Sequence, residues 1–294
     1  MKRWLLAIIL SWAGASAAAQ QGTLLLSELL YQPLSGEAEY VELYNNSNAP
    51  VELADYHIVR WVSDSLGRHY PLPQHTLAPH AYVALTKDAA SVRSCYRLEP
   101  GAALLECDLP PYPNGGGNAI VSTADSIVVD RFDYSPSMHS PMLRNKAGVS
   151  LERRSFERPT GEASNWFSAS STCGYGTPGA ANSQSTEWLA MANDFEFSSE
   201  LLSPDGDGYQ DELEIAYRLD DGSLAARVDI YNARGLMVRR LLNNALLGAH
   251  GSLVWDGRGA DGQTLPQGQY IVQITLYNAA GTQQTLRRVI ALMR

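Results

Sequence analysis

The stretch from Ser203 to Asp211 places the carboxylates of Asp205, Asp207 and Asp211 within seven residues, together with two glycines. Carboxylates that converge repel one another unless a cation or water separates them. Hard cations such as Ca²⁺ take about six to eight oxygen ligands, and a loop broken by glycine lets carboxylate and carbonyl oxygens meet. The spacing therefore predicts a Ca²⁺ site at Asp205, Asp207 and Asp211. Calcium is the one cofactor that the sequence indicates.

This stretch does not follow the EF-hand pattern. Counted from Asp205, Tyr209 and Gln210 stand where an EF-hand loop has an oxygen ligand and a glycine, and Ala216 stands where it has the distal glutamate. The alternative interpretation is a solvated Asp/Gly turn that begins a strand. A melting curve that is the same with Ca²⁺ and with a chelator would favour the turn.

Other acidic and nucleophilic residues give weaker signals for chemistry. Glu28, Glu39 and Glu42 lie on neighbouring predicted strands and would form paired carboxylates if they met. We expect them instead on the solvent face of a sandwich, and Glu42 in particular alternates with the apolar residues Val41 and Leu43. Ser150 stands in Gly-Val-Ser-Leu-Glu, which lacks the second glycine of a nucleophile elbow. The sequence therefore predicts no catalytic residues.

The histidines and a glycine-rich stretch also lack the context of a site. His75 and His80 lie in a proline-bearing loop, where solvated side chains are expected rather than metal ligands, and no H-E-x-x-H motif is present. Asn114 to Asn118 contains three consecutive glycines but lacks the lysine and the following helix of a phosphate-binding loop. We expect a loop there.

Composition and the N-terminus predict an exported acidic protein. The 294 residues include 31 acidic and 22 basic side chains, a net charge of −9, which argues against nucleic acid as a partner. Lys2 and Arg3 precede an apolar run from Trp4 to Trp12, and Ala17 to Ala19 offers a cleavage site, so residues 1–19 are predicted to be a cleaved signal peptide. The mature chain is expected to have no transmembrane segment.

Three cysteines are present in the chain. Cys95 and Cys107 are close in sequence and are candidates for a disulfide in an oxidising compartment, which would leave Cys173 unpaired. The sequence does not decide whether this bond forms.

Short alternating runs punctuated by Pro, Gly and Asn predict an all-β protein. Expected strands before the acidic stretch cover residues 22–28, 39–45, 51–53, 56–62, 82–86, 119–122 and 126–134, and those after it cover 212–217, 226–231, 237–242, 252–255, 269–277 and 285–292. This density of short strands is typical of antiparallel sandwiches. Trp166, Trp188 and Trp255 are expected in the cores.

Two stretches carry family resemblances. The run Glu39-Tyr-Val-Glu-Leu, followed by Gly148-Val-Ser-Leu-Glu-Arg153, Asn165-Trp166, Gly176-Thr-Pro-Gly179 and Asn182-Ser183, resembles a bacterial lamin tail domain, which implies an immunoglobulin-like sandwich with a binding or scaffolding role. The region from Phe195 to Arg294 resembles the immunoglobulin-like domain of flagellar hook-capping proteins, and its opening Ser-Pro-Asp-Gly-Asp-Gly resembles gliding-motility-associated C-terminal domains of Bacteroidetes. The pairing implies an envelope protein of that phylum.

These observations predict two tandem immunoglobulin-like β-sandwich domains after the signal peptide. The expected boundaries are a lamin-tail-like sandwich over 20–184, a linker and first strand over 185–199, and a C-terminal sandwich over 200–294.

The expected function is structural, adhesive or scaffolding. The expected partner is an envelope protein or a surface polysaccharide, and the expected location is the periplasm, the outer-membrane surface or the exterior. One alternative is an accessory component or cargo of a type IX secretion or gliding machinery, because the C-terminal resemblance extends to its sorting domains. A calcium-dependent hydrolase is the other alternative, although no catalytic domain remains once two sandwiches are assigned.

Overall fold

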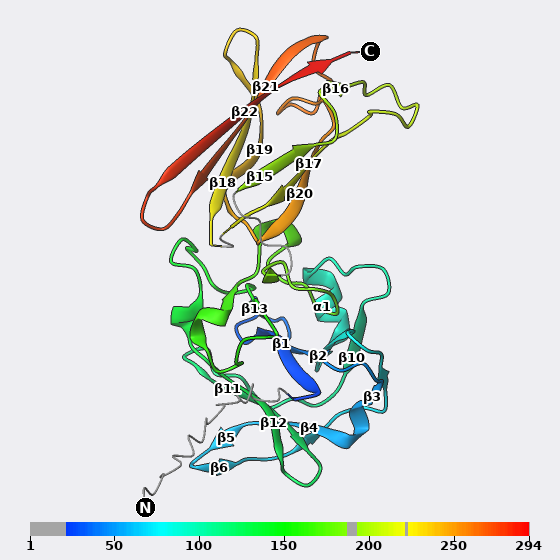
Figure 1. Ribbon diagram of the computed structural model, residues 1–294, viewed down its shortest axis with the longest axis vertical. Coiled ribbons are helices and arrows are strands. Elements are labelled where there is room, and N and C mark those ends of the chain that lie inside the picture. Colours follow the sequence, from blue (N-terminus) through cyan, green and yellow to red (C-terminus); the bar gives the residue numbers. More distant parts are fainter. Residues whose placement is uncertain (1–21, 187–192, 221–222, 294) are drawn as a thin grey trace, which may run out of the picture.

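The computed structural model describes residues 22–186, 193–220 and 223–293, and it contains two β domains stacked along the long axis of the molecule (Figure 1). The predicted signal peptide and Trp188 lie outside the described residues. The all-β, two-sandwich expectation is confirmed, since each domain contains two separate sheets around its own apolar core.

The N-terminal domain consists of a six-stranded and a four-stranded sheet. The first has the order β10 (Ala103–Glu106), β9 (Tyr82–Thr86), β2 (Tyr40–Asn45), β1 (Leu24–Leu30), β13 (Leu151–Arg153) and β14 (Trp166–Ser168). The second has the order β12 (Val128–Tyr134), β11 (Gly117–Thr123), β4 (Tyr56–Val59) and β7 (Tyr70–Pro71). Two small pairs complete it: β3 (Val51–Glu52) with β8 (Thr76–Leu77), and β5 (Trp61–Val62) with β6 (Ser65–Leu66). The domain also contains the short 3₁₀ helices η1 (Leu53–Asp55), η2 (Pro136–Met138), η3 (Ala163–Asn165) and η4 (Ser171–Cys173).

Strand β1 is the centre of this domain and is buried along its whole length. Leu24, Leu26 and Leu29 belong to the core between the two sheets. A register shift between Leu26 and Glu28 changes the alternation at that point. Leu30 therefore joins a second apolar cluster, which lies outside the main core. A strand that is buried on both faces shows no alternation of apolar and polar residues, as in the β1 sequence Leu-Leu-Leu-Ser-Glu-Leu-Leu.

One edge of the larger sheet departs from the antiparallel expectation. Strands β9 and β10 pair in parallel, and helix α1 (Ala89–Cys95) connects them. Asp88 caps this helix by accepting a hydrogen bond from the backbone N–H of Ser91. Val92 then packs in the second apolar cluster together with Leu30. The helix was missed because seven residues are too few to show a helical period.

The C-terminal domain pairs a three-stranded sheet, β15 (Asp194–Phe197), β17 (Leu213–Arg218) and β20 (His250–Trp255), with a five-stranded sheet. The five-stranded sheet has the order β16 (Leu201–Leu202), β22 (Gln283–Leu292), β21 (Gly268–Tyr277), β18 (Ala225–Asn232) and β19 (Met237–Leu246). Trp255 is fully buried in this core, and Trp166 is buried in the other one, as expected for both.

Two further expectations concern the thiols and the membrane. Cys95, Cys107 and Cys173 are all free thiols, so Cys95 and Cys107 do not form the candidate disulfide in this structure. Within the described part of the chain, no helix has the length and apolar character needed to cross a membrane.

Candidate functional site

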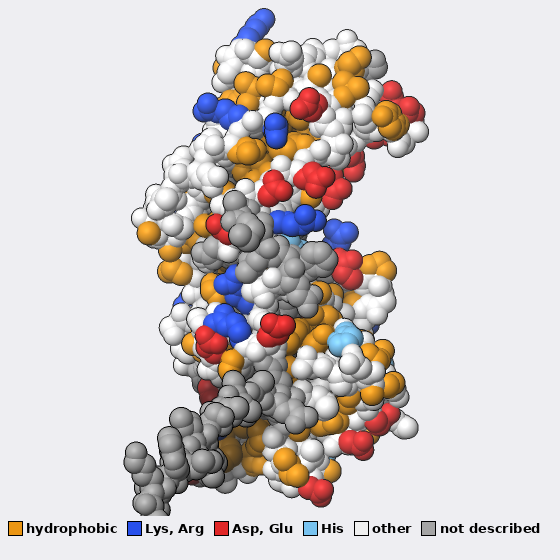
Figure 2. Space-filling view, in the orientation of Figure 1, with side chains coloured by type: hydrophobic (Ala, Val, Ile, Leu, Met, Phe, Trp, Pro, Cys, Tyr) orange, Lys and Arg blue, Asp and Glu red, His pale blue; other side chains and the backbone are white. Residues whose placement is uncertain are grey.

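The acidic loop follows β16 and projects from the C-terminal domain. Figure 2 shows acidic side chains gathered at the position of this loop, at the upper right. One oxygen from each of Asp205, Asp207 and Asp211 lies within 4.8 Å of the others. Among the described residues, this is the one group of three or more potential metal ligands whose ligand atoms all lie that close to one another. The structure thus brings the three predicted ligands to one place.

Backbone hydrogen bonds hold this loop in shape. The two oxygens of Asp211 accept from the N–H groups of Gly206 (2.6 Å) and Gly208 (2.8 Å). Both glycines have positive φ, of +84° and +87°, where an L side chain would be strained. The carboxylate of Asp207 accepts from the N–H of Tyr209 at 2.7 Å. The donor set is all oxygen and exposed or half-exposed, which fits a hard cation such as Ca²⁺.

A second acidic cluster is buried in the N-terminal domain. Glu28 of β1 lies opposite Glu42 of β2 and opposite Glu152 of β13, so the three carboxyl groups form a row across adjacent strands. All three residues are 0% exposed. The expectation that Glu28 and Glu42 face solvent is therefore wrong, and Glu152 was missed. The reason is that another segment of the chain covers this face of the sheet.

Residues 176–184 are that covering segment. Gly179 donates its N–H to Glu42 Oε2 at 2.6 Å, and Gln184 donates its N–H to Glu152 Oε2 at 2.9 Å. Gly179 has φ +82°, and a Cβ there would lie 2.7 Å from the carbonyl oxygen of Ala103, so glycine is required. The Gly-Thr-Pro-Gly motif therefore shapes a lid over the glutamates.

The contacts of Thr177 imply that the row holds protons. Its hydroxyl oxygen lies 3.1 Å from Glu28 Oε2 and 3.0 Å from Glu152 Oε1. One hydroxyl hydrogen serves one of these acceptors, so the other contact is satisfied when the carboxyl group itself donates. In addition, Glu42 Oε1 has no hydrogen-bond partner among the described residues, which a carboxylate would not tolerate well.

The electrostatic environment also favours the protonated form of these three carboxyl groups. Burial raises the pKa of Glu152 from its usual 4.5 to about 8, and the neighbouring Glu28 contributes further. Burial, followed by the charge of Glu28, raises the pKa of Glu42 well above its usual value. The pKa of Glu28 is also raised by burial, against hydrogen bonds from Ser150 and Tyr40 that favour its ionised form.

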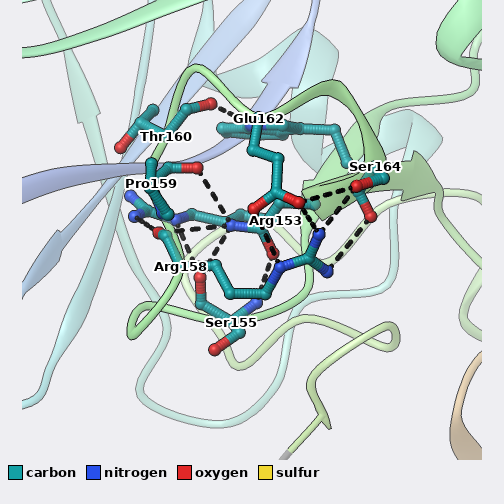
Figure 3. A network of polar contacts seen from close by, with 9 residues as sticks. Arg153, Ser155, Arg158, Pro159, Thr160, Glu162 and Ser164 are labelled. Atoms are coloured by element: carbon teal, nitrogen blue, oxygen red, sulfur yellow. Dashed lines mark hydrogen bonds and ion pairs between the residues drawn. The ribbon is translucent and has the colours of Figure 1, made fainter.

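Arg153, which follows Glu152 on β13, forms a third buried polar centre. It pairs with Asp130 at 3.5 Å and donates to the carbonyl oxygens of Ser155, Arg158 and Leu26 at 3.1, 2.7 and 3.3 Å. Figure 3 shows it at the centre of the loop that joins β13 and β14, where Arg158 also pairs with Glu162. The Ser-Leu-Glu-Arg motif thus places one side chain in the glutamate row and the next in this network.

The remaining candidates have structural partners or stand alone. Glu39 accepts from the N–H of Tyr112 at 3.2 Å, and burial raises its pKa to about 7, but its carboxyl group is not in the row. His80 contacts Tyr44 (3.1 Å) and Asn48 (2.9 Å), so it is a loop residue, as expected. Ser150 donates to Glu28, which makes it part of the buried row.

Family models match both domains. The Lamin Tail Domain model matches residues 17–136, and the FlgD Ig-like domain model matches residues 202–280. The chain contains a lamin tail domain followed by a FlgD Ig-like domain. The motifs of the lamin tail resemblance between residues 148 and 183 lie beyond the matched segment, yet β13 and β14 complete the same sheet.

Three solved structures illustrate the wider similarity. FlgD from P. aeruginosa is 19% identical, with 33% of this chain and 67% of that chain covered and a TM-score of 0.24. PorU from Porphyromonas gingivalis is 13% identical (87% and 18% covered, TM-score 0.28), and PorZ from the same organism is 13% identical (90% and 30% covered, TM-score 0.26). The chain thus spans less than a third of PorU and of PorZ. No curated protein matches the sequence.

The lid of the lamin tail domain also contacts the FlgD Ig-like domain. The carbonyl oxygen of Ser183 accepts from the N–H of Ala249 at 2.9 Å, while the hydroxyl of Ser183 donates to Glu152 at 2.8 Å. The hydroxyl of Thr172 lies 2.7 Å from that of Tyr217, and Ser171 donates to the carbonyl oxygen of Leu246. The glutamate row and the domain interface therefore share one segment.

Proposed function

We propose that this protein is a non-enzymatic, exported component of the cell envelope with a structural, adhesive or scaffolding role. Both of its domains belong to families of immunoglobulin-like structural modules. Function in such modules depends on surfaces and loops that bind a partner. The partner that this role requires is an envelope protein or a surface polysaccharide.

One observation carries the proposal. The carboxyl groups best suited to acid/base chemistry in the lamin tail domain are those of Glu28, Glu42 and Glu152. Residues 176–184 cover them, so a substrate cannot reach them. They serve the fold and the domain interface instead. The full burial of Glu42, one of the candidate paired carboxylates, counts against the hydrolase alternative.

Recovery of partners from the cell envelope tests this proposal. The tagged full chain is expressed, cells are cross-linked and fractionated, and captured partners are identified by mass spectrometry. We expect the chain in the envelope or exported fractions, with a stoichiometric envelope protein or surface polysaccharide. A cytoplasmic chain that captures nothing would contradict the proposal. A machine subunit recovered together with an uncleaved C-terminus would favour the type IX accessory alternative, while a cleaved C-terminus would favour cargo.

We also propose that the acidic loop binds Ca²⁺ through Asp205, Asp207 and Asp211. Its support is the convergence of three carboxylates within 4.8 Å on a loop already held by backbone hydrogen bonds. A cation at this point would relieve the repulsion among them. The loop joins β16 to β17, so its order would stabilise the first strands of the FlgD Ig-like domain.

Removal of Ca²⁺ should therefore lower the melting temperature of the FlgD Ig-like domain. At a free Ca²⁺ concentration of about 100 times Kd, binding contributes about 2.7 kcal/mol. For a domain of this size, that corresponds to roughly 10–20 °C. Calorimetry of the full chain with Ca²⁺ and with a chelator measures the shift. Asp205→Asn should abolish it, while Asp261→Asn, in another aspartate turn, should preserve it. Identical melting curves of the wild-type chain with Ca²⁺ and with the chelator would refute the proposed Ca²⁺ site.

A further inference from the structure

A groove of about 1050 Å³ lies between the two domains. The lamin tail domain contributes the segment around Arg144 and Asn145 and the ring of Tyr175. The FlgD Ig-like domain contributes Arg227 of β18 and Tyr277 of β21. This volume is at the upper end of the range for ligand pockets, which leaves room for an extended molecule rather than a single ion.

The charge of the groove is opposite to that of the protein. Two arginines and no acidic residue line it, although the chain as a whole carries a net charge of −9. Arg144 is exposed and has no ion pair or side-chain hydrogen bond within the described ranges. Arg227 pairs with Asp229 at 2.7 Å, but Asp229 also pairs with Arg240 at 2.6 Å, so this trio keeps one net positive charge. The groove therefore favours an anionic ligand.

Uncommitted polar groups accompany these charges. Asn243 and Asn244 at the end of β19 are exposed, line the groove and make no side-chain hydrogen bond in the described part of the chain. The hydroxyls of Tyr175 and Tyr277, both half-buried, also make no hydrogen bond there, and that of Tyr277 lies in the field of Arg227. Amides, guanidinium groups and phenols can satisfy the many hydroxyls of a sugar, while aromatic rings pack against its apolar faces.

The backbone at the groove is strained. Tyr175 has φ +70°, whereas the φ of +52° at Asn244 is one that asparagine adopts readily. Positive φ in a bulky residue such as tyrosine is uncommon, and it costs about 1–2 kcal/mol. Glycine precedes and follows Tyr175. Of these three consecutive residues, only Tyr175 has a side chain, and it lines the groove. Such strain concentrates at ligand sites.

We propose that this groove binds an acidic polysaccharide. Arg144 and Arg227 would pair with its carboxylate groups, Tyr175 and Tyr277 would pack against sugar rings, and the asparagines would bind hydroxyls. A peptide fits less well, because β19 has register breaks against β18 and offers no regular edge for an added strand. This inference rests on the proposed envelope role and names its ligand and its site.

Binding of polygalacturonate oligosaccharides to the full chain tests the proposal. Isothermal titration should show wild-type binding that weakens with salt, because exposed charges are screened. Arg144→Gln should reduce affinity about tenfold, which corresponds to loss of one charge-assisted contact worth about 1.4 kcal/mol. The matched control is Arg234→Gln, in the turn at the opposite end of β18, which should bind as the wild type does. Neutral dextran should bind weakly or not at all.

Three outcomes would overturn the proposal that this groove binds an acidic polysaccharide. They are no binding of polygalacturonate by the wild type, equal affinities of the Arg144→Gln and Arg234→Gln variants, and binding of poly-glutamate at least as tight as that of polygalacturonate. The last result would assign the groove to an acidic peptide. The protein could still fractionate with the envelope and capture a partner but fail to bind polygalacturonate. That result would reject the polysaccharide site in the groove and would leave the proposed envelope role unaffected.

Discussion

Raising the pH from about 5 to about 8 should lower the free energy of unfolding of the lamin tail domain by roughly 3–4 kcal/mol through Glu152 alone. In the folded domain this carboxyl group keeps its proton until the pH reaches about 8, whereas in the unfolded chain it loses it near 4.5. Between these values the unfolded state binds fewer protons, so stability falls by about 1.4 kcal/mol per pH unit. Glu28 and Glu42 act in the same direction.

Hydrogen exchange of the amides of β1 and β13 measures this effect in the lamin tail domain of the full chain. Glu152→Gln removes the titrating group and should make the pH slope shallower by about 1.4 kcal/mol per unit. Glu157→Gln changes an exposed glutamate in the following loop and should keep the wild-type slope. A stability that is constant or rises over this pH range would show that the row is ionised in the folded state.

Arg153→Met should destabilise the lamin tail domain by about 3–5 kcal/mol. The Arg153 side chain is 0% exposed, and its removal leaves the buried carboxylate of Asp130 without a counter-charge. Three carbonyl oxygens also lose the hydrogen bond from Arg153, while Asn165 Nδ2 still donates to that of Ser155 at 2.9 Å. Arg153→Met combined with Asp130→Asn should recover part of the loss, because the double variant buries no unpaired charge.

Urea unfolding of the full chain measures the change as a shift in the midpoint of the lamin tail transition. The control is Arg131→Met, which breaks the pair of Arg131 with Asp133, whose side chains are 41% and 57% exposed. That variant should lose less than about 1 kcal/mol. Equal losses of unfolding free energy in Arg153→Met and Arg131→Met would show that the buried Arg153–Asp130 pair stabilises the domain no more than the exposed Arg131–Asp133 pair.

The glutamate row shows where sequence patterns reach their limit. Glu28 and Glu42 are charged residues of the kind expected on a solvent face, and Glu42 alternates with Val41 and Leu43 within the motif that suggested the family. Their burial depends on residues 176–184, which lie more than 130 residues away in the chain and return to cover the sheet. Only the register of β2, β1 and β13 could reveal that Glu152 belongs with them.

The acidic loop is the opposite case. Asp205, Asp207 and Asp211 are so close in sequence that two glycines and a turn suffice to bring their carboxylates together. The sequence predicts this cluster, because the whole site is formed by a single local segment. Whether it holds Ca²⁺ stays a prediction until the chelation experiment is made.

The sequence by itself determined the all-β class, the two domains, the tryptophans of both cores and the acidic loop, because periodicity, turn residues and short-range spacing act over a few residues. Tertiary structure decided the parallel β9–β10 edge, the buried glutamates, the Arg153 network and the groove between the domains. The glutamate row, the Arg153–Asp130 pair and the groove join side chains from segments far apart in the chain, and the β9–β10 edge depends on pairing across helix α1. Burial, shifted pKa values and shared surfaces arise only from such long-range contacts, which no local pattern records.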